Sequence, residues 1–178
     1  MPELPEVETV KRIIEPQITG QKIAWVEICN NQVIAHPEPE RFAEILSGRA
    51  FTSMSGRGKF LSFHMDNGDE LVLHLRMAGQ LLVTPENHPL EKHTHVIIHL
   101  EDGRQIRYID VRRFGRFWYL REGEADTFTG RNKLGPEPWD PEFTAAYLQT
   151  KLGKKKKAIA VKTVRNFCVA NPDKIEIV

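Results

Sequence analysis

A strand–turn–strand pattern occurs twice along this chain of 178 residues, and it restricts the possible folds strongly. In each copy, runs of alternating apolar and polar residues flank a loop that contains a glycine, Gly68 in the first copy and Gly103 in the second. Such an arrangement is typical of a β-hairpin. The runs cover residues 60–65 with 70–75, residues 95–100 with 105–109, and a further aromatic run over residues 116–120. We therefore predict a mainly β fold with flanking helices, either an antiparallel β-sandwich or a flattened barrel.

Helical patterns precede the hairpins. The first places apolar residues at the spacing of one helical face, namely Leu4, Val7, Val10 and Ile14. Pro16 is expected to end this helix, because proline lacks the backbone N–H that continues the hydrogen-bond ladder. A strand is expected over residues 22–29. Residues 39–47 then predict a second helix, with Gly48 as its C-terminal stop.

The C-terminal part has a different organisation. Residues 134–138 are rich in proline and glycine and indicate a connector. After it, Asp140 is the expected N-cap of a helix that ends at Gly153, and a further basic helix follows. We predict a β-sandwich domain over residues 1–130 and, over residues 131–178, a linker followed by a short helical segment that is the incomplete start of a helical domain.

Composition excludes several classes of protein. The formal net charge is only +1, so any surface that binds nucleic acid must be a local basic patch. No apolar run is long enough to span a bilayer, and the N-terminus is acidic where a secretory signal would be basic, so we expect a cytoplasmic protein without membrane contact. Cys29 and Cys168 lie far apart and form no Cys-x-x-Cys pair, which argues against a disulfide framework and against a zinc site.

The N-terminus carries a candidate reactive group. Removal of Met1 would expose Pro2 as a secondary amine, and an α-amino group has a pKa of about 7.7 to 8.0, so part of it is neutral and nucleophilic at physiological pH. An amine of this kind can form a cationic iminium with a sugar carbon, and Glu3 is close enough in sequence to transfer protons. The alternative from these residues alone is an ordinary acidic start of a helix.

Six motifs follow one another in order along the chain: PELPEVETV at residues 2–10, GRGKFL at 56–61, HLRMAGQL at 74–81, KHTHV at 92–96, RRFGR at 112–116 and LGPEP at 134–138. Together they resemble the formamidopyrimidine-DNA glycosylase family, the bacterial enzymes of oxidised-purine repair. The leucine at position 4 favours this family over the related endonuclease VIII group, which usually has glycine there.

The resemblance implies a catalytic set. Pro2 would attack the nucleotide as a Schiff-base nucleophile, and Glu3 would be its proton-transfer partner. Glu6 would order the start of the helix, and Lys59 would hold a phosphate beside the lesion. The implied activity is excision of formamidopyrimidine and 8-oxoguanine from DNA, followed by β,δ-elimination at the abasic site.

The resemblance also implies a DNA-binding set. Met77, Arg112 and Phe114 would fill the gap that a flipped-out nucleotide leaves, and His74 would contact the backbone. Arg113 and Arg116 belong to the same basic cluster as Arg112, which is of the kind that binds phosphates. Other interpretations remain open from the residues alone: Met77 and Phe114 would be core residues, and the arginines would face solvent at a strand end.

The family normally continues into a helix-two-turns-helix unit and a four-cysteine zinc finger, both of which bind DNA. From residue 160 the sequence leaves that pattern, so we expect a truncated copy without the zinc finger and without any metal or cofactor. The expected partner is damaged double-stranded DNA, bound by a monomer. Two other hypotheses are a non-catalytic remnant with weak DNA binding and an unrelated β-rich module that binds a metal or small ligand.

Overall fold

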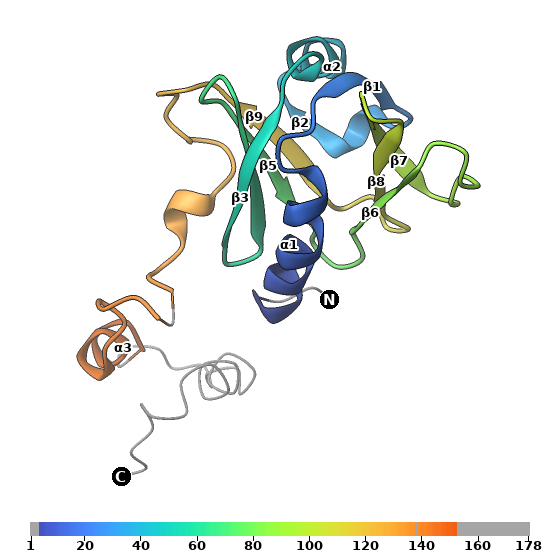
Figure 1. Ribbon diagram of the computed structural model, residues 1–178. Coiled ribbons are helices and arrows are strands. Elements are labelled where there is room, and N and C mark those ends of the chain that lie inside the picture. The colour runs from blue at the N-terminus through green and yellow to red at the C-terminus, as the bar shows by residue number, and fades with distance from the viewer. Residues whose placement is uncertain (1–3, 138, 153–178) are drawn as a thin grey trace. The chain divides into compact units, whose positions relative to one another are not determined.

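The computed structural model describes residues 4–137 and 139–152, which divide into two compact units between Asn132 and Lys133. The two units are considered separately. The larger unit contains all the strands and the first two helices of the described chain (Figure 1). Its elements are α1 (Leu4–Ile18), β1 (Ile23–Ile28), η1 (Asn31–Val33), β2 (Ile34–His36), α2 (Pro39–Leu46), β3 (Phe51–Arg57), β4 (Phe60–Met65), β5 (Glu70–His74), β6 (Gln80–Pro85), β7 (Thr94–Leu100), β8 (Arg104–Ile109) and β9 (Arg116–Leu120).

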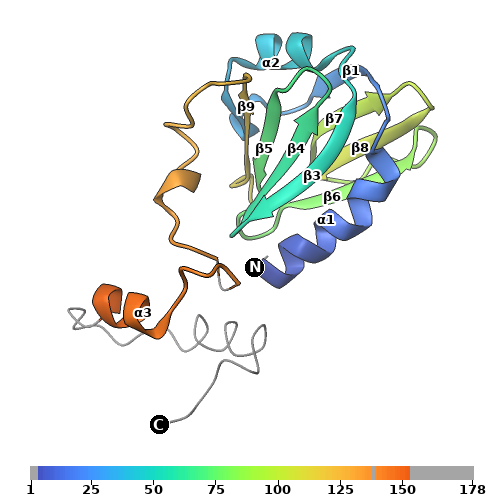
Figure 2. The same ribbon diagram turned by 60° about the vertical axis from the view of Figure 1, so that its left-hand side comes forward.

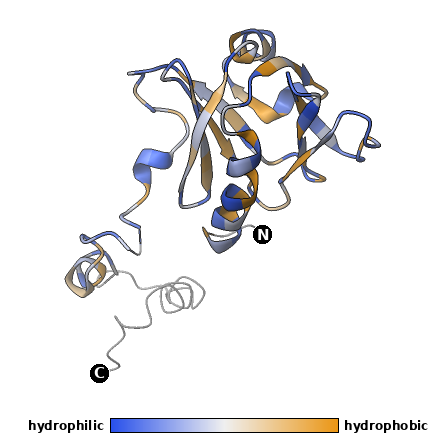
Figure 3. Cartoon of the chain, viewed as in Figure 1, coloured by the Kyte–Doolittle hydropathy of each residue, from blue (hydrophilic) through white to orange (hydrophobic). Residues whose placement is uncertain are grey.

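The strands form two sheets that pack face to face. In the described chain one sheet has the order β1-β7-β8-β6 and the other the order β2-β9-β5-β4-β3, and every pair except β2 with β9 is antiparallel. Hydrophobic residues are concentrated on the strands, whereas the loops are mostly hydrophilic (Figure 3). The predicted sandwich is confirmed. The alternative of a flattened barrel is wrong, because the two described sheets stay separate and neither closes on itself.

The two helices of this unit cover the open sides of the sandwich, where the edge strands of both sheets lie. Helix α1 packs against β3 and β6, and α2 packs against β1 and β2 (Figure 2). Each helix buries one apolar face, formed by Val7, Ile14 and Ile18 in α1 and by Phe42 and Leu46 in α2. No helix in the described chain is long and apolar enough to cross a membrane.

The prediction that Pro16 ends the first helix is wrong, since α1 continues to Ile18. Proline removes one hydrogen bond of the ladder, but Ile14 and Ile18 lie fully buried on either side of it and hold the last turn against the sheet. Glu15 adds a second anchor: its Oε1 accepts a hydrogen bond from the backbone N of Met54 at 2.7 Å. This bond satisfies a donor on the edge strand β3.

Both predicted hairpins are present. Strand β4 pairs with β5 from Phe60 opposite His74 to His64 opposite Glu70, and β7 pairs with β8. The predicted strands at residues 22–29 and 116–120 and the helix at 39–47 correspond to β1, β9 and α2. The sequence pattern does not mark β2, β3 and β6. All three lie at sheet edges, and β3 buries only Phe51 and Met54.

A second apolar cluster lies on the outer face of the five-stranded sheet, formed by Phe60, Val72, Trp118 and Leu120. The segment after β9 returns to this face through Arg131. The Arg131 guanidinium forms a bidentate ion pair with Glu70, and it also donates to Ser62 Oγ at 2.8 Å and Asp126 Oδ2 at 3.2 Å. Burial alone would raise the pKa of Glu70, but the bonds from Arg131 and Ser62 outweigh it and lower that pKa below its usual value.

The smaller unit contains α3 (Ala145–Leu152), after the short helix η2 (Arg131–Lys133) that spans the boundary. The prediction that this helix starts at Asp140 is wrong. The Asp140 carboxylate instead accepts a hydrogen bond from the N–H of Glu137 at 2.7 Å, and Thr144 caps the helix by accepting from the N–H of Tyr147 at 3.1 Å. The predicted helix end at Gly153 and the basic helix after it lie outside the described residues.

The ion pair of Arg131 with Glu70 is expected to contribute measurably to stability. Glu70→Gln should lower the free energy of unfolding by about 1–3 kcal/mol at pH 7, because it removes the bidentate charged partner of a largely buried guanidinium and leaves it paired with Asp126 at 3.2 Å. Urea unfolding measures the change. The control is Glu44→Gln, which breaks the exposed ion pair with Arg41 and should change stability by less than about 0.5 kcal/mol. Equal losses in the two variants would contradict this role for Arg131.

Candidate nucleic-acid interface

Two loops carry the chain from one sheet to the other at the same end of the sandwich. Residues 75–79 join β5 to β6, and residues 110–115 join β8 to β9. Because β5 pairs with β9 and β6 pairs with β8, the loops start and end on paired strands: His74 is opposite Arg116, and Gln80 is opposite Ile109. The topology therefore forces the two loops to lie side by side.

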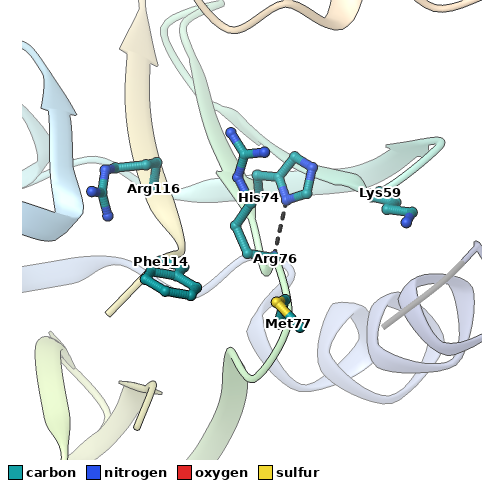
Figure 4. Close-up of a pocket in the computed structure, with 6 residues that line it drawn as sticks. All are labelled: Lys59, His74, Arg76, Met77, Phe114 and Arg116. Carbon is teal, nitrogen blue, oxygen red and sulfur yellow. Dashed lines mark hydrogen bonds between the residues drawn. The ribbon is translucent and has the colours of Figure 1, made fainter. Parts of the chain in front are cut away.

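A pocket of about 500 Å³ opens between these loops and the β3–β4 turn (Figure 4). Its lining consists of Lys59, His74, Arg76, Met77, Phe114 and Arg116. No acidic side chain lines it among the described residues. The pocket thus combines three cations with two apolar side chains, which suits a ligand that has both phosphates and flat apolar surfaces.

Met77 and Phe114 are exposed, with relative accessibilities of 43% and 52%. The alternative that they belong to the core is therefore wrong. Arg112 does not line the pocket, but its Nη1 lies 3.2 Å from the Met77 sulfur, so the structure brings it to the same loop tips. Apolar side chains held in water at a loop tip are typical of a binding surface.

The backbone before each exposed apolar residue is unusual. Arg76 precedes Met77 with a φ of 54°, and Arg113 precedes Phe114 with a φ of 56°. The left-handed conformation costs about 1 kcal/mol or more for a residue with a side chain. Among the described residues Arg113 does not line the pocket; its carbonyl accepts a hydrogen bond from Arg116 Nη1 at 2.8 Å. Arg113 therefore contributes here mainly through its backbone.

Asp110 organises the second loop from inside. Its side chain is fully buried and accepts hydrogen bonds from the backbone N–H groups of Arg112 at 3.0 Å and of Phe114 and Gly115 at 2.9 Å, and from the Tyr108 hydroxyl at 2.9 Å. Burial alone would raise its pKa, but the donors from Gly115 and Tyr108 outweigh burial and lower the pKa of Asp110 below its usual value. Asp110 is therefore a buried carboxylate anion.

His74 is a neutral donor at the pocket wall. Its Nδ1 accepts the backbone N–H of Arg76 at 2.9 Å, so its proton is on Nε2. Burial, together with the nearby cations Arg76 and Lys59, lowers the pKa of His74 to about 4. A neutral imidazole can donate one hydrogen bond to a phosphate, but it adds no charge to the pocket.

The predicted catalytic residues are only partly described. Pro2 and Glu3 lie outside the described residues. Glu6 is exposed in the first turn of α1. The N-terminal end of α1 lies at the same end of the sandwich as the turn between β3 and β4 (Figures 1 and 2).

Sequence reasoning missed Arg76 as a pocket residue and Asp110 as the loop organiser. Arg76 had a signal, since it lies within the HLRMAGQL motif directly before Met77. Asp110 had a weaker signal, as an acidic residue two positions before the basic cluster of Arg112, Arg113 and Arg116. Arg116, which the sequence analysis placed in that cluster, lines the pocket.

The lowered pKa of His74 can be measured directly. An NMR titration should give an imidazole pKa near 4. Because the unfolded chain binds the proton near pH 6.5, stability should be full above about pH 6.5 and decrease as the pH falls from there toward 4. His74→Gln should remove that part of the pH dependence. A titration midpoint near 6.5 would contradict the assignment.

No group of three or more His, Cys, Asp or Glu side chains is placed to hold a metal ion within residues 4–137 and 139–152.

The sequence and the fold have counterparts among known proteins. Formamidopyrimidine-DNA glycosylases from Moorella thermoacetica and Bacillus subtilis are 46% identical over 159 residues and 45% identical over 160 residues, respectively; each match covers 89% of this chain and 58% of the relative. The chain thus spans about three fifths of the length of these relatives.

Solved structures give the same result. The Lactococcus lactis enzyme in complex with DNA that contains FAPY-dG matches with a TM-score of 0.82 and 33% identity, over 93% of this chain and 62% of that one. The same enzyme bound non-covalently to DNA with an AP site matches with a TM-score of 0.83 and 32% identity, over 93% and 63%. The sequence model of the formamidopyrimidine-DNA glycosylase N-terminal domain matches residues 1–117, which is more than half of the chain. The chain therefore belongs to the formamidopyrimidine-DNA glycosylase family.

Proposed function

We propose that this chain acts in base-excision repair as a DNA glycosylase with AP lyase activity, on formamidopyrimidine and 8-oxoguanine lesions in double-stranded DNA. The observation that carries the proposal is the pocket, where Lys59, Arg76 and Arg116 surround two exposed apolar side chains at loop tips. The identity of the curated relatives, which are DNA glycosylases, and the solved complexes of family members with lesion-containing DNA support it.

The binding step follows from the chemistry of the pocket. Cations attract the phosphate backbone and release counterions, which supplies most of the sequence-independent affinity. Flipping a nucleotide out of the duplex costs a few kcal/mol in lost stacking. Phe114 and Met77 would recover part of this cost by filling the gap, and Arg112, held beside Met77, would donate to the base left without a partner.

The chemical step would use the N-terminus. The neutral amine of Pro2 would attack C1′ of the flipped nucleotide and form a C–N bond while the C1′–base bond breaks, and the departing base takes up a proton. The C1′–O4′ bond of the sugar ring then breaks as O4′ takes up a proton and the Pro2 nitrogen loses its own proton, which leaves an iminium between Pro2 and C1′. This iminium makes the C2′–H bond acidic. Loss of that proton then expels the 3′ phosphate, and a second elimination expels the 5′ phosphate. Glu3 would carry the protons between these steps.

The covalent intermediate is open to a direct test. Borohydride reduction of the processed protein with an abasic-site duplex should give a covalent adduct, and peptide mass mapping should place it on Pro2. Chain that retains Met1 should give no adduct, because its Pro2 nitrogen is an amide.

Pro2→Gly and Glu3→Gln should abolish strand cleavage and keep the fold. Binding without an adduct in processed protein would leave only a non-catalytic DNA-binding role, and cleavage in both variants would refute the mechanism.

The gap-filling role of Phe114 predicts a selective loss. Phe114→Ala should weaken binding to a duplex with an abasic-site analogue about tenfold, since stacking on one aromatic side chain is worth roughly 1–3 kcal/mol. Binding to the undamaged duplex should stay nearly constant. Phe128→Ala is the matched control: Phe128 is exposed to a similar degree, but its ring lies tilted against that of His36 at a centroid distance of 4.6 Å, and it does not line the pocket. Fluorescence anisotropy measures both affinities, and equal effects on the two duplexes would argue against gap filling.

A further inference from the structure

We infer that the Tyr108 hydroxyl and the Asp110 carboxylate act together as a positioning pair that holds the two pocket loops, residues 75–79 and 110–115, as one rigid unit. The inference rests on the proposed function, in which these loops carry the side chains that enter the DNA. It assigns a role to two buried residues that contribute no side chain to the pocket itself.

Asp110 fixes the second loop through nearly every polar atom it has. Its Oδ1 accepts from Arg112 N, and its Oδ2 accepts from Phe114 N and Gly115 N. Its carbonyl oxygen accepts from Arg113 N at 3.2 Å and lies 2.7 Å from His95 Nε2 on strand β7. The loop that presents Arg112 and Phe114 is thus wrapped around one buried anion. A buried charge that lost these donors would be strongly unfavourable, so the loop conformation is tied to them.

Tyr108 extends this hold to the first loop. It lies in β8 with a relative accessibility of 1%, and its ring packs edge-on against Phe117 at a centroid distance of 5.0 Å. A Cβ atom on Gly115 would lie 1.7 Å from the Tyr108 hydroxyl oxygen, and one on Gly79 would lie 2.9 Å from the same atom. The hydroxyl group therefore occupies the space between both loops, and each loop needs glycine where it passes this group.

The pair also helps the strained backbone of the second loop to persist. Arg113 has the left-handed conformation, which is retained only when the surrounding structure fixes it, and the Asp110 bonds to residues 112–115 do so. Burial and the neighbouring Asp110 raise the pKa of Tyr108, so its hydroxyl stays protonated and keeps donating. Loops fixed before binding lose less conformational entropy when they enter DNA.

The chain contains a matched control for this pair. The Tyr119 hydroxyl donates to Asp69 Oδ2 at 2.6 Å, and Asp69 Oδ1 accepts the backbone N–H of Glu122 at 2.8 Å. Tyr119 is buried to nearly the same extent, at 2% accessibility, but it lines a different pocket with His36 and Arg121. Tyr119→Phe therefore removes the same kind of bond without touching either loop.

The test compares Tyr108→Phe with Tyr119→Phe by native-state hydrogen exchange of backbone amides. In Tyr108→Phe the Phe114 and Gly115 amides should exchange at least about tenfold faster, whereas core amides of β4 should not change relative to the wild type. In Tyr119→Phe the two loop amides should keep their wild-type rates. Unchanged exchange rates of the two loop amides in Tyr108→Phe would show that the inference is wrong. It would also be wrong if the β4 amides exchanged faster by the same factor, because the hydroxyl would then stabilise the core in general.

A second measurement, of DNA affinity, distinguishes failure of this inference from failure of the proposed function. The ratio of affinities for abasic-analogue duplex over undamaged duplex should fall severalfold in Tyr108→Phe and stay constant in Tyr119→Phe. If the wild-type chain shows no preference for the abasic duplex, the proposed function fails, while the exchange data still decide whether the pair holds the loops. Faster loop exchange with an unchanged ratio would refute the positioning role in DNA binding.

Discussion

The pairing of β5 with β9 in one sheet and of β6 with β8 in the other is the constraint on which the site depends. The chain crosses between the sheets twice at the same end, and the two pairings place these crossings next to each other. Side chains that are about 35 residues apart, such as Met77 and Arg112, are thereby brought into contact. Helices α1 and α2 close the open sides of the sandwich and leave this end accessible, so the fold itself determines where a ligand can enter.

The charge of the site is a local property. The chain as a whole has a formal net charge of +1, yet Lys59, Arg76 and Arg116 line one pocket and His74 beside them stays neutral. Asp110, the anion of the second loop, is buried and saturated with hydrogen-bond donors, so it does not present its oxygens to the pocket. A polyanion approaching this end would meet the cations and the apolar tips together, which favours a nucleic acid over a simple anion.

The sequence predicted the parts of the fold that local patterns control. Glycine-containing turns between alternating runs identified the hairpins β4–β5 and β7–β8, and Gly48 marked the end of α2. Burial overrode local preference at Pro16, where Ile14 and Ile18 hold the helix together beyond the proline. Edge strands such as β3 bury too few side chains to show a period. Family motifs identified Lys59, Met77 and Phe114, whereas the roles of Arg76 and Asp110 depend on tertiary contacts that the local sequence marks only weakly.

The site is assembled at the expense of stability. Arg76 and Arg113 each cost about 1 kcal/mol or more in left-handed backbone, and exposed Met77 and Phe114 forgo roughly 1.5–3 kcal/mol each that full burial would give. A fold selected for stability alone would place glycine at the two strained positions and polar residues at the tips. The buried bonds of Asp110 and Tyr108 offset part of this cost, but they do so by locking the tips in the exposed position. A ligand that covers Met77 and Phe114 would bury both side chains and so recover the free energy that their exposure forgoes. The exposed tips therefore favour the ligand-bound state over the free state.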